Sequence, residues 1–304
     1  MYIVYSAATE ISMKWQSKVA VVTGGGSGIG EAMALRLAAE GMRLVIADVN
    51  RDAAEKVAAA IEAGGGIALP VQADVSRQDA LLALADFSWS SLGAVDLVCA
   101  NAGVVPSGRY RPVWDYPLED WEWALGVNLM GLVHTIRAFI PRMIEQATPG
   151  HFVTTASVAG LVSGAGSAVY STSKHGAVRV TEALYASLKE KNLPIGVTLL
   201  CPGVVNTKIY QSERNRPDNL MPPAGIAEET PELQSLADDL FRNALTPEAV
   251  ADQVMTAVQT GQFYCLTSDS YDRAIGSRTD ALLCRANPEF TGLLDMVKAD
   301  VPAT

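Results

Sequence analysis

Hydrophobic residues along the chain fall into two alternating kinds of segment. Short runs rich in β-branched residues, such as "KVAVVT" (18–23), are typical of strands buried on both faces of a sheet. Longer Ala-rich segments, such as "IGEAMALRLAAEG" (29–41), have helical spacing, and Gly41 is placed to end that helix. The same reading predicts strands at 18–23, 43–48, 67–74, 95–103, 151–157, 195–203 and 263–267, and helices at 29–41, 51–65, up to about 92, twice within 117–147, at 168–192 and at 246–260.

The regular alternation of strands and helices predicts one parallel sheet covered by helices on both faces and joined by right-handed crossovers. We find no internal repeat, low-complexity segment or clear linker, so 18–304 is predicted to be a single Rossmann-type α/β domain after an N-terminal extension at 1–17. Met13 within that extension reads like a natural start. The irregular segment 208–245 is interpreted as a substrate loop or lid, with a passive surface excursion as the alternative. In the C-terminal tail, 268–304, "YDRAIGSRTDALL" predicts a helix.

Composition and charge narrow the choice of partners. The chain has a formal net charge of -10 and no cluster of Lys or Arg, which argues against binding to nucleic acid or to an anionic membrane. Its four Cys and three His lack the spacing of zinc ligands, so we expect no metal site and reduced thiols. No apolar run is long enough to cross a bilayer, and the N-terminus lacks the basic start of a signal peptide. We therefore expect a cytoplasmic protein with a small-molecule partner.

A glycine-rich loop, "TGGGSGIG" (23–30), lies between the first strand and the first helix. Glycines there allow a tight turn and let a phosphate approach the helix N-terminus, which carries a partial positive charge of about +0.5. Asp48 ends the second strand, where a carboxylate accepts hydrogen bonds from an adenosine ribose. The alternative is a glycine-rich turn without a ligand. Asp48 and the position within a β-α-β unit favour dinucleotide binding, with the spacing Gly24, Gly28, Gly30.

Tyr170 and Lys174 are four residues apart in the predicted 168–192 helix and therefore share one of its faces. A nearby ammonium favours the phenolate, so we expect Lys174 to lower the pKa of Tyr170 from its ordinary value near 10. A phenol tuned in this way exchanges a proton with an alcohol or a ketone. Taken singly, Tyr170 reads as a half-buried aromatic, Lys174 as a solvated helix charge and Ser157 as a cap.

The loop spacing and the Tyr-Lys pair together resemble those of the short-chain dehydrogenase/reductase family. The resemblance is strong over 18–207 and extends to 246–267 by pattern only. It implies a seven-stranded doubly wound sheet in the order 3-2-1-4-5-6-7 and a homodimer or homotetramer. Small departures are Ala100 and Ala156, where many members have Asn and Ser. The marks occur in the family's order as "TGGGSGIG" (23–30), "ADV" (73–75), "NAG" (101–103), "VN" (127–128), Ser157, "YSTSK" (170–174) and "PGVVNT" (202–207).

The resemblance also implies roles for individual residues. Tyr170 would be the general acid/base, tuned by Lys174, which also holds the nicotinamide ribose. Ser157 would bond the reacting oxygen, and Asn128 would shape its helix and hold a water of a proton relay. The residues implied to bind the cofactor are Gly24, Ser27, Gly28, Ile29, Gly30, Asp48, Asp74, Val75, Asn101, Ala102, Gly103, Tyr170, Lys174, Pro202, Gly203, Val205 and Thr207.

The implied reaction is hydride transfer between NAD(H) and a secondary alcohol or ketone. NAD is favoured over NADP because the Asp48 carboxylate would repel a 2′-phosphate, while Ser27 and Val49 stand where relatives that use NADP often carry a basic residue. The alternative function is a non-catalytic NAD-binding sensor or scaffold, against which the complete catalytic set argues. Aromatic and Met residues in 104–117 and 208–245 would line a pocket for a bulky substrate, namely Tyr110, Trp114, Tyr210 and Met221.

Overall fold

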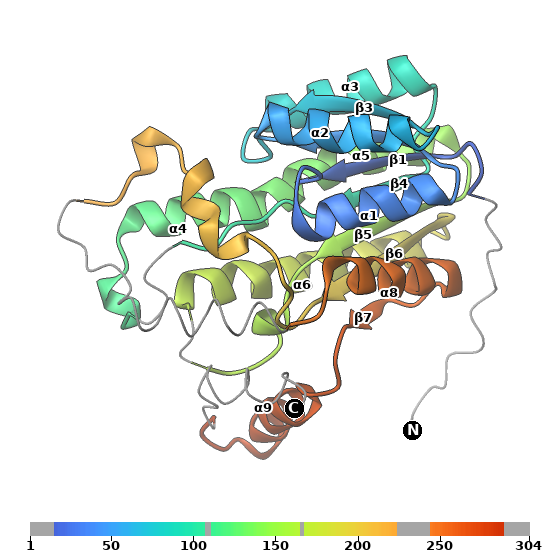
Figure 1. Cartoon of the computed structure of the whole chain (residues 1–304). Coiled ribbons are helices and arrows are strands. Elements are labelled where there is room, and N and C mark those ends of the chain that lie inside the picture. The colour runs from blue at the N-terminus through green and yellow to red at the C-terminus, as the bar shows by residue number, and fades with distance from the viewer. Residues whose placement is uncertain (1–14, 107–110, 165–166, 224–243, 289–304) are drawn as a thin grey trace.

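The computed structural model describes residues 15–106, 111–164, 167–223 and 244–288. Within them, seven strands form one parallel sheet in the order β3-β2-β1-β4-β5-β6-β7, which confirms the predicted fold class and strand order (Figure 1). The strands are β1 (Val19–Thr23), β2 (Arg43–Asp48), β3 (Ile67–Gln72), β4 (Leu97–Ala100), β5 (Gly150–Thr155), β6 (Ile195–Cys201) and β7 (Tyr264–Leu266).

Helices cover both faces of this sheet and enclose two apolar cores (Figure 1). The first core joins the sheet to α1 (Gly28–Ala39), α2 (Arg51–Ala63) and α8 (Pro247–Thr260). The second joins it to α3 (Gln78–Leu92), α5 (Gly131–Gln146) and α6 (Ala168–Glu190). Every residue of β1 and β4 is buried, which explains the continuous apolar runs, whereas the edge strand β3 has exposed positions.

One long helix combines three elements where the sequence predicted two helical stretches. α4 (Leu118–Ala124) continues through a π-helical turn, η2 (Leu125–Met130), into α5. By length and composition, Leu118–Gln146 could cross a membrane, which corrects the expectation that no segment is long and apolar enough. Half of its most apolar stretch is buried inside the protein, as in the core helices of soluble proteins, so the evidence for a membrane span is weak.

The two ends of the described chain differ in how deeply they are buried. Trp15, inside the predicted extension, is buried in the first core, and the Ser17 N–H donates to the Gly41 carbonyl. At the other end, α9 (Asp272–Cys284) confirms the helix predicted in the tail. It projects from the body of the protein and has no buried residue, although Tyr271 just before it is buried (Figure 1). The domain boundaries themselves stay a prediction.

Candidate active site

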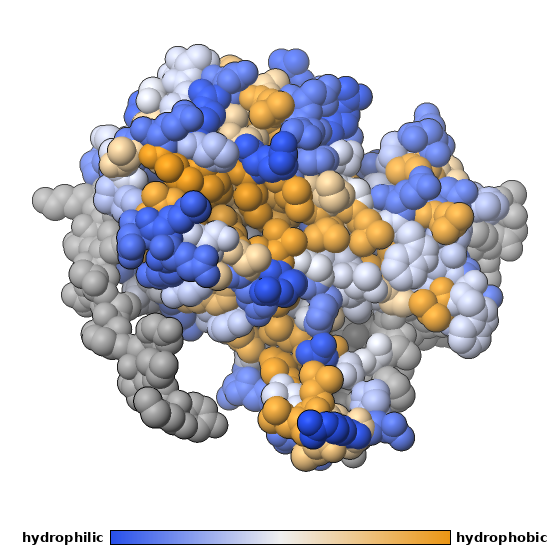
Figure 2. All heavy atoms as spheres, turned by 180° about the vertical axis from the view of Figure 1, so that it is seen from behind, coloured by the Kyte–Doolittle hydropathy of each residue, from blue (hydrophilic) through white to orange (hydrophobic). Residues whose placement is uncertain are grey.

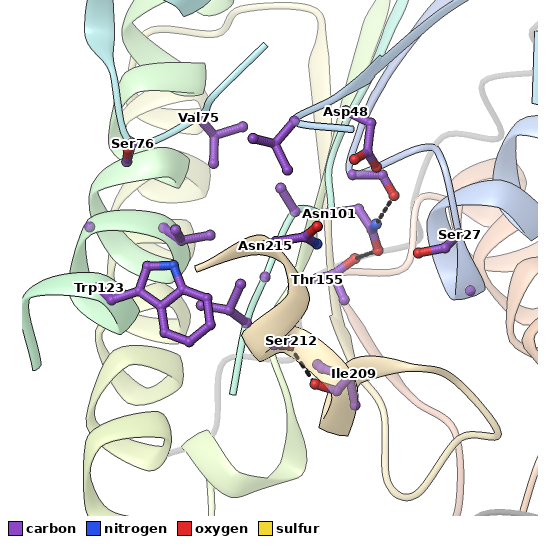
Figure 3. A pocket seen from close by; sticks show the side chains of 18 of the residues that line it. Ser27, Asp48, Val75, Ser76, Asn101, Trp123, Thr155, Ile209, Ser212 and Asn215 are labelled. Atoms are coloured by element: carbon purple, nitrogen blue, oxygen red, sulfur yellow. Dashed lines mark hydrogen bonds between the residues drawn. The ribbon is translucent and has the colours of Figure 1, made fainter. Parts of the chain in front are cut away.

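A cavity of about 370 Å³ opens at the carboxyl ends of the central strands (Figure 3). Five of the predicted site residues, Gly30, Asn128, Ser157, Gly203 and Val205, do not line it. The others do, and they come from loops that are far apart in the sequence. They are Gly24, Ser27, Gly28, Ile29, Asp48, Asp74, Val75, Asn101, Ala102, Gly103, Tyr170, Lys174, Pro202 and Thr207.

The glycine loop turns sharply before α1 because Gly24 and Gly28 have φ values of 61° and 57°, a region that favours glycine. Gly30 is needed for a different reason. A Cβ there would lie 2.1 Å from the Gly24 carbonyl oxygen and 2.6 Å from Asn101 Nδ2. Ser27 precedes α1 without bonding to that helix through its side chain, and it lines the cavity instead. This cradle at a helix N-terminus fits a dinucleotide pyrophosphate.

Two carboxylates line the wall of the cavity nearest β2 and β3. Asp48 accepts the Gly26 N–H through Oδ2 and the Asn50 N–H through Oδ1, both at 2.9 Å, and so ties the glycine loop to the end of β2. Asp74 accepts the N–H of Ser76 at 2.9 Å and its hydroxyl at 2.7 Å. A carboxylate has about four acceptor positions, so each retains capacity for a ligand hydroxyl or amine.

The amide of Asn101 joins the glycine loop to β5. Its Nδ2 donates to the carbonyls of Thr23 and Gly24, both at 3.2 Å, and its Oδ1 accepts the Thr155 hydroxyl at 3.1 Å (Figure 3). The sequence analysis missed Thr155, which also accepts Lys174 Nζ on its carbonyl at 2.9 Å. Thr155 ends β5 at the same edge of the sheet as the glycine loop, and only this position in the sequence indicates a role for it in the site.

Lys174 and Tyr170 lie on one face of α6, as predicted. The Lys174 side chain is buried, and its Nζ is 5.7 Å from the centre of the Tyr170 ring. Burial lowers the pKa of Lys174 to about 8. Burial also raises the pKa of Tyr170 to about 12, and a hydrogen bond with Ser157 opposes the rise. The pKa of Tyr170 therefore lies above its ordinary value and not below it as expected, because burial of the phenol is the largest cause of the shift.

The side chain of Ser157 has three partners, one of them the Pro202 carbonyl, to which its Oγ donates at 3.5 Å. Its Oγ accepts the Ala159 N–H at 3.1 Å, capping the short helix η3 (Val158–Gly160), and it bonds to Tyr170. Gly203 and Val205 lie in the segment that follows β6 and do not line the cavity. The Gly203 N–H donates to the Thr267 hydroxyl, and Val205 is buried and forms a bridge with Leu245.

Asn128 lies in the π-helical turn and is buried behind the cavity wall. Its Oδ1 accepts the Val104 N–H at 2.8 Å, while its Nδ2 donates to the Val104 carbonyl and to Ser173 Oγ, both at 2.9 Å. The Ser173 hydroxyl, whose part the sequence analysis missed, donates to the Tyr170 carbonyl at 2.7 Å. A Cβ at Gly103 would lie 3.2 Å from Lys174 Nζ and 3.4 Å from Asn128 Oδ1, so these two side chains flank one point.

The outer part of the cavity uses side chains that were not predicted. Trp123 of α4 faces it from one side, and Ile209 and Ser212 of η4 (Ile209–Asn215) close it from another (Figure 3). Ser212 Oγ accepts the Val105 N–H at 3.2 Å and donates to the Ile209 carbonyl. Trp114 and Met221, expected to line the cavity, do not; they are 80% and 55% exposed. Tyr210 does not line it either, and Tyr110 is outside the described residues.

The described ranges contain no group of three or more His, Cys, Asp or Glu side chains placed to hold a metal ion.

Comparison with known proteins identifies relatives over most of the chain. Residues 18–218 match the family described as short chain dehydrogenase. The chain is 32% identical to a CLA biosynthesis dehydrogenase/reductase from Lactiplantibacillus plantarum, over 90% of this chain and 96% of that protein. It is 37% identical to a 1-deoxy-11-beta-hydroxypentalenate dehydrogenase from Streptomyces exfoliatus, over 84% and 85%. A short chain dehydrogenase/reductase from Burkholderia phymatum, crystallised in complex with NAD, superposes with a TM-score of 0.84 at 37% identity, over 92% and 99%.

Proposed function

The chain belongs to the short-chain dehydrogenase family of oxidoreductases, and we propose that it transfers hydride between NAD(H) and a secondary alcohol or ketone. One observation carries the proposal: Tyr170, Ser157, Lys174 and Asn128 come together beside a cavity that the glycine loop also lines. Each of these residues has a common structural use when taken alone. Their convergence beside a dinucleotide cradle supports a catalytic role for the set.

The residues of the cavity fit a nicotinamide dinucleotide. The glycine loop and the start of α1 would hold the pyrophosphate, Asp48 the adenosine ribose, and Asp74 with Val75 the adenine. Lys174 would hold the nicotinamide ribose, with Ile29 and the segment 202–207 around the ring. When bound, the cofactor supplies a carbon that accepts or donates hydride. The NAD complex of the Burkholderia relative supports this assignment.

We favour NAD over NADP because of the charges around Asp48. A 2′-phosphate would meet this carboxylate, whose two oxygens already hold the backbone of the glycine loop and of Asn50. The basic residue closest to Asp48 along the chain is Arg51, but its Nε is bonded to Glu55 at 2.7 Å, its side chain is largely exposed and it does not line the cavity. The Asp48 carboxylate would therefore accept a hydrogen bond from a 2′-hydroxyl and repel a 2′-phosphate.

Tyr170 would exchange the proton of the substrate oxygen, and the Ser157 hydroxyl would bond that oxygen and orient it. With a pKa of about 12, the phenol is protonated at neutral pH and ready to act as the acid in ketone reduction. Alcohol oxidation needs the phenolate, which the Lys174 ammonium and an oxidised, cationic nicotinamide would both stabilise. Lys174 has a pKa of about 8 and is thus mostly charged at pH 7.

The substrate is proposed to be a bulky apolar alcohol or ketone. The outer cavity presents Trp123, Ile209 and Leu220, and apolar walls of this kind hold an apolar body while a few polar groups orient it. The relative from Streptomyces exfoliatus is named for a hydroxylated substrate, 1-deoxy-11-beta-hydroxypentalenate, which supports an alcohol as the reacting group. A panel of propan-2-ol, cyclohexanol and borneol, followed by NADH absorbance, tests it, and turnover of propan-2-ol in preference to borneol would refute it.

Tyr170→Phe tests the reaction itself. We expect the variant to lose at least about 100-fold in turnover while NAD still raises its melting temperature as in the wild type. Tyr185→Phe is the matched control, since Tyr185 lies on the same helix but packs on Phe263 away from the cavity. NAD binding without turnover in the wild type would favour the scaffold alternative. Stronger thermal protection by NADP than by NAD would overturn the cofactor assignment.

The chain is also proposed to work as a homodimer or homotetramer. Figure 2 shows a band of hydrophobic residues across the face opposite to that of Figure 1. Exposed apolar patches of this kind are typical of protein–protein interfaces. Light scattering coupled to size-exclusion chromatography checks the assembly, and a monomer at micromolar concentration would contradict it.

A further inference from the structure

A buried ion pair lies next to the outer cavity, apart from the four residues discussed above. The Arg216 side chain is 0% exposed, and its Nη2 lies 2.6 Å from Asp120 Oδ1 in α4. Arg216 also donates through Nε to the Leu220 carbonyl at 2.6 Å and through Nη1 to Glu213 Oε1 at 3.2 Å. One guanidinium therefore ties η4, the segment after it and α4 together.

Trp123 completes the arrangement. The guanidinium carbon of Arg216 lies 4.8 Å from the centre of the Trp123 ring, within the range of a cation–π contact. Asp120 and Trp123 are three residues apart on α4, so one helix face presents both to the arginine. Trp123 and two neighbours of Arg216, Asn215 and Pro217, line the cavity. The buried pair is thus in direct contact with a wall of the site without belonging to its lining.

We propose that Asp120, Arg216 and Trp123 form a specificity clamp, in which Arg216 is the positioning residue that holds η4 and the Trp123 ring as the wall against which the bulky part of the substrate packs. The assignment of a substrate to that wall rests on the function proposed above. Proteins in which hydrophobic residues replace a buried ion pair are often at least as stable. The geometry that Arg216 imposes therefore explains its presence better than a gain in stability does. Its planar fork bonds three partners at once while stacking on an indole, which a lysine does not reproduce.

Limited digestion with trypsin tests the clamp without any substrate. Trypsin can cut after Lys208, just before η4, and after Arg214, inside η4. The bond after Arg216 resists trypsin because Pro217 follows it. We expect Arg216→Lys and Asp120→Asn to be cut at Lys208 and Arg214 about 10-fold faster than the wild type, because the segment opens more often. Unchanged cleavage rates in both folded variants would overturn the clamp.

Arg142→Lys is the matched control for this experiment. Arg142 also pairs with an aspartate, Asp86, at 2.6 Å and lies 4.3 Å from the centre of an indole ring, that of Trp89, but none of the three lines the cavity. The control should be cut at the wild-type rate. Acceleration in the control equal to that of the clamp variants would show general loosening and would also overturn the proposal.

Steady-state kinetics test the specificity part. For Arg216→Lys we expect KM for borneol to rise about 10-fold, with kcat for propan-2-ol within about twofold of the wild type, and for Trp123→Ala we expect a rise in KM for borneol at least as large. A structural defect alone would lower kcat for both alcohols in proportion to the unfolded fraction, and that pattern would refute the proposal. Should Tyr170→Phe keep its turnover while the digestion result holds, the proposed function would fail and the clamp would stand.

Discussion

Replacing Asn128 by Leu should lower both the stability of the protein and its turnover. The amide makes three buried hydrogen bonds, two with the backbone of Val104 and one with Ser173. Leu has a similar size but no polar atoms, so the buried N–H and C=O of Val104 lose their side-chain partners. Each unsatisfied buried backbone group costs about 1–3 kcal/mol, so we expect the free energy of unfolding to fall by about 2–6 kcal/mol.

Urea denaturation followed by circular dichroism measures this loss, with Asn50→Ala as the control. Asn50 is exposed and caps α2 through one bond to the Ala53 N–H, so its removal should cost about 1 kcal/mol. Turnover of the folded Asn128→Leu protein should fall at least about 10-fold, because Ser173 and the Tyr170 backbone lose a fixed neighbour. A stability loss no larger than that of the control, with turnover retained, would refute the reasoning.

Three further outcomes follow from the structure. Burial lowers the pKa of His151 from 6.5 to about 4, so the unfolded state binds more protons in that window and the free energy of unfolding should fall by about 3 kcal/mol as pH drops from 6.5 to 4. His151→Gln should flatten this dependence and exposed His175→Gln should not; equal slopes in urea titrations would contradict it. Gly30→Ala should abolish protection by NAD in thermal shift assays, since its Cβ would meet the Gly24 carbonyl, whereas Gly276→Ala in open space on α9 should not. Asp48→Ala should reduce the preference for NAD over NADP about 10-fold in KM, and an unchanged ratio would remove Asp48 from cofactor selection.

The fold was predictable because each strand and helix has its own local pattern. The π-helical turn between α4 and α5 was not, because the local residues Leu125–Met130 do not show where an extra residue enters the helix. The turn is stabilised by tertiary hydrogen bonds from Asn128 to Val104 and Ser173, and no local propensity encodes such partners.

Within the site, motif positions were predictable and electrostatics were not. The spacing of Tyr170 and Lys174 places them on one helix face, but the pKa of each group depends on how deeply the whole fold buries it. The aromatic wall shows the same limit. Trp114, before α4, and Trp123, within it, are nine residues apart, yet only the fold decides that Trp114 faces solvent and Trp123 faces the cavity.

The π-helical turn gives this long helix one more residue than a regular α-helix would need at the same place, because its backbone bonds span five residues instead of four. Deleting one residue between Leu125 and Met130 would let the turn close as regular α-helix, so α4 would keep its orientation to α5 and Asp120 and Trp123 would stay beside Arg216. Adding one residue as regular α-helix would instead rotate α4 by roughly 100° relative to α5 and turn both side chains away from Arg216. A one-codon deletion here should therefore disturb the bonds of Asn128 and spare the clamp, whereas a one-codon insertion should break the clamp.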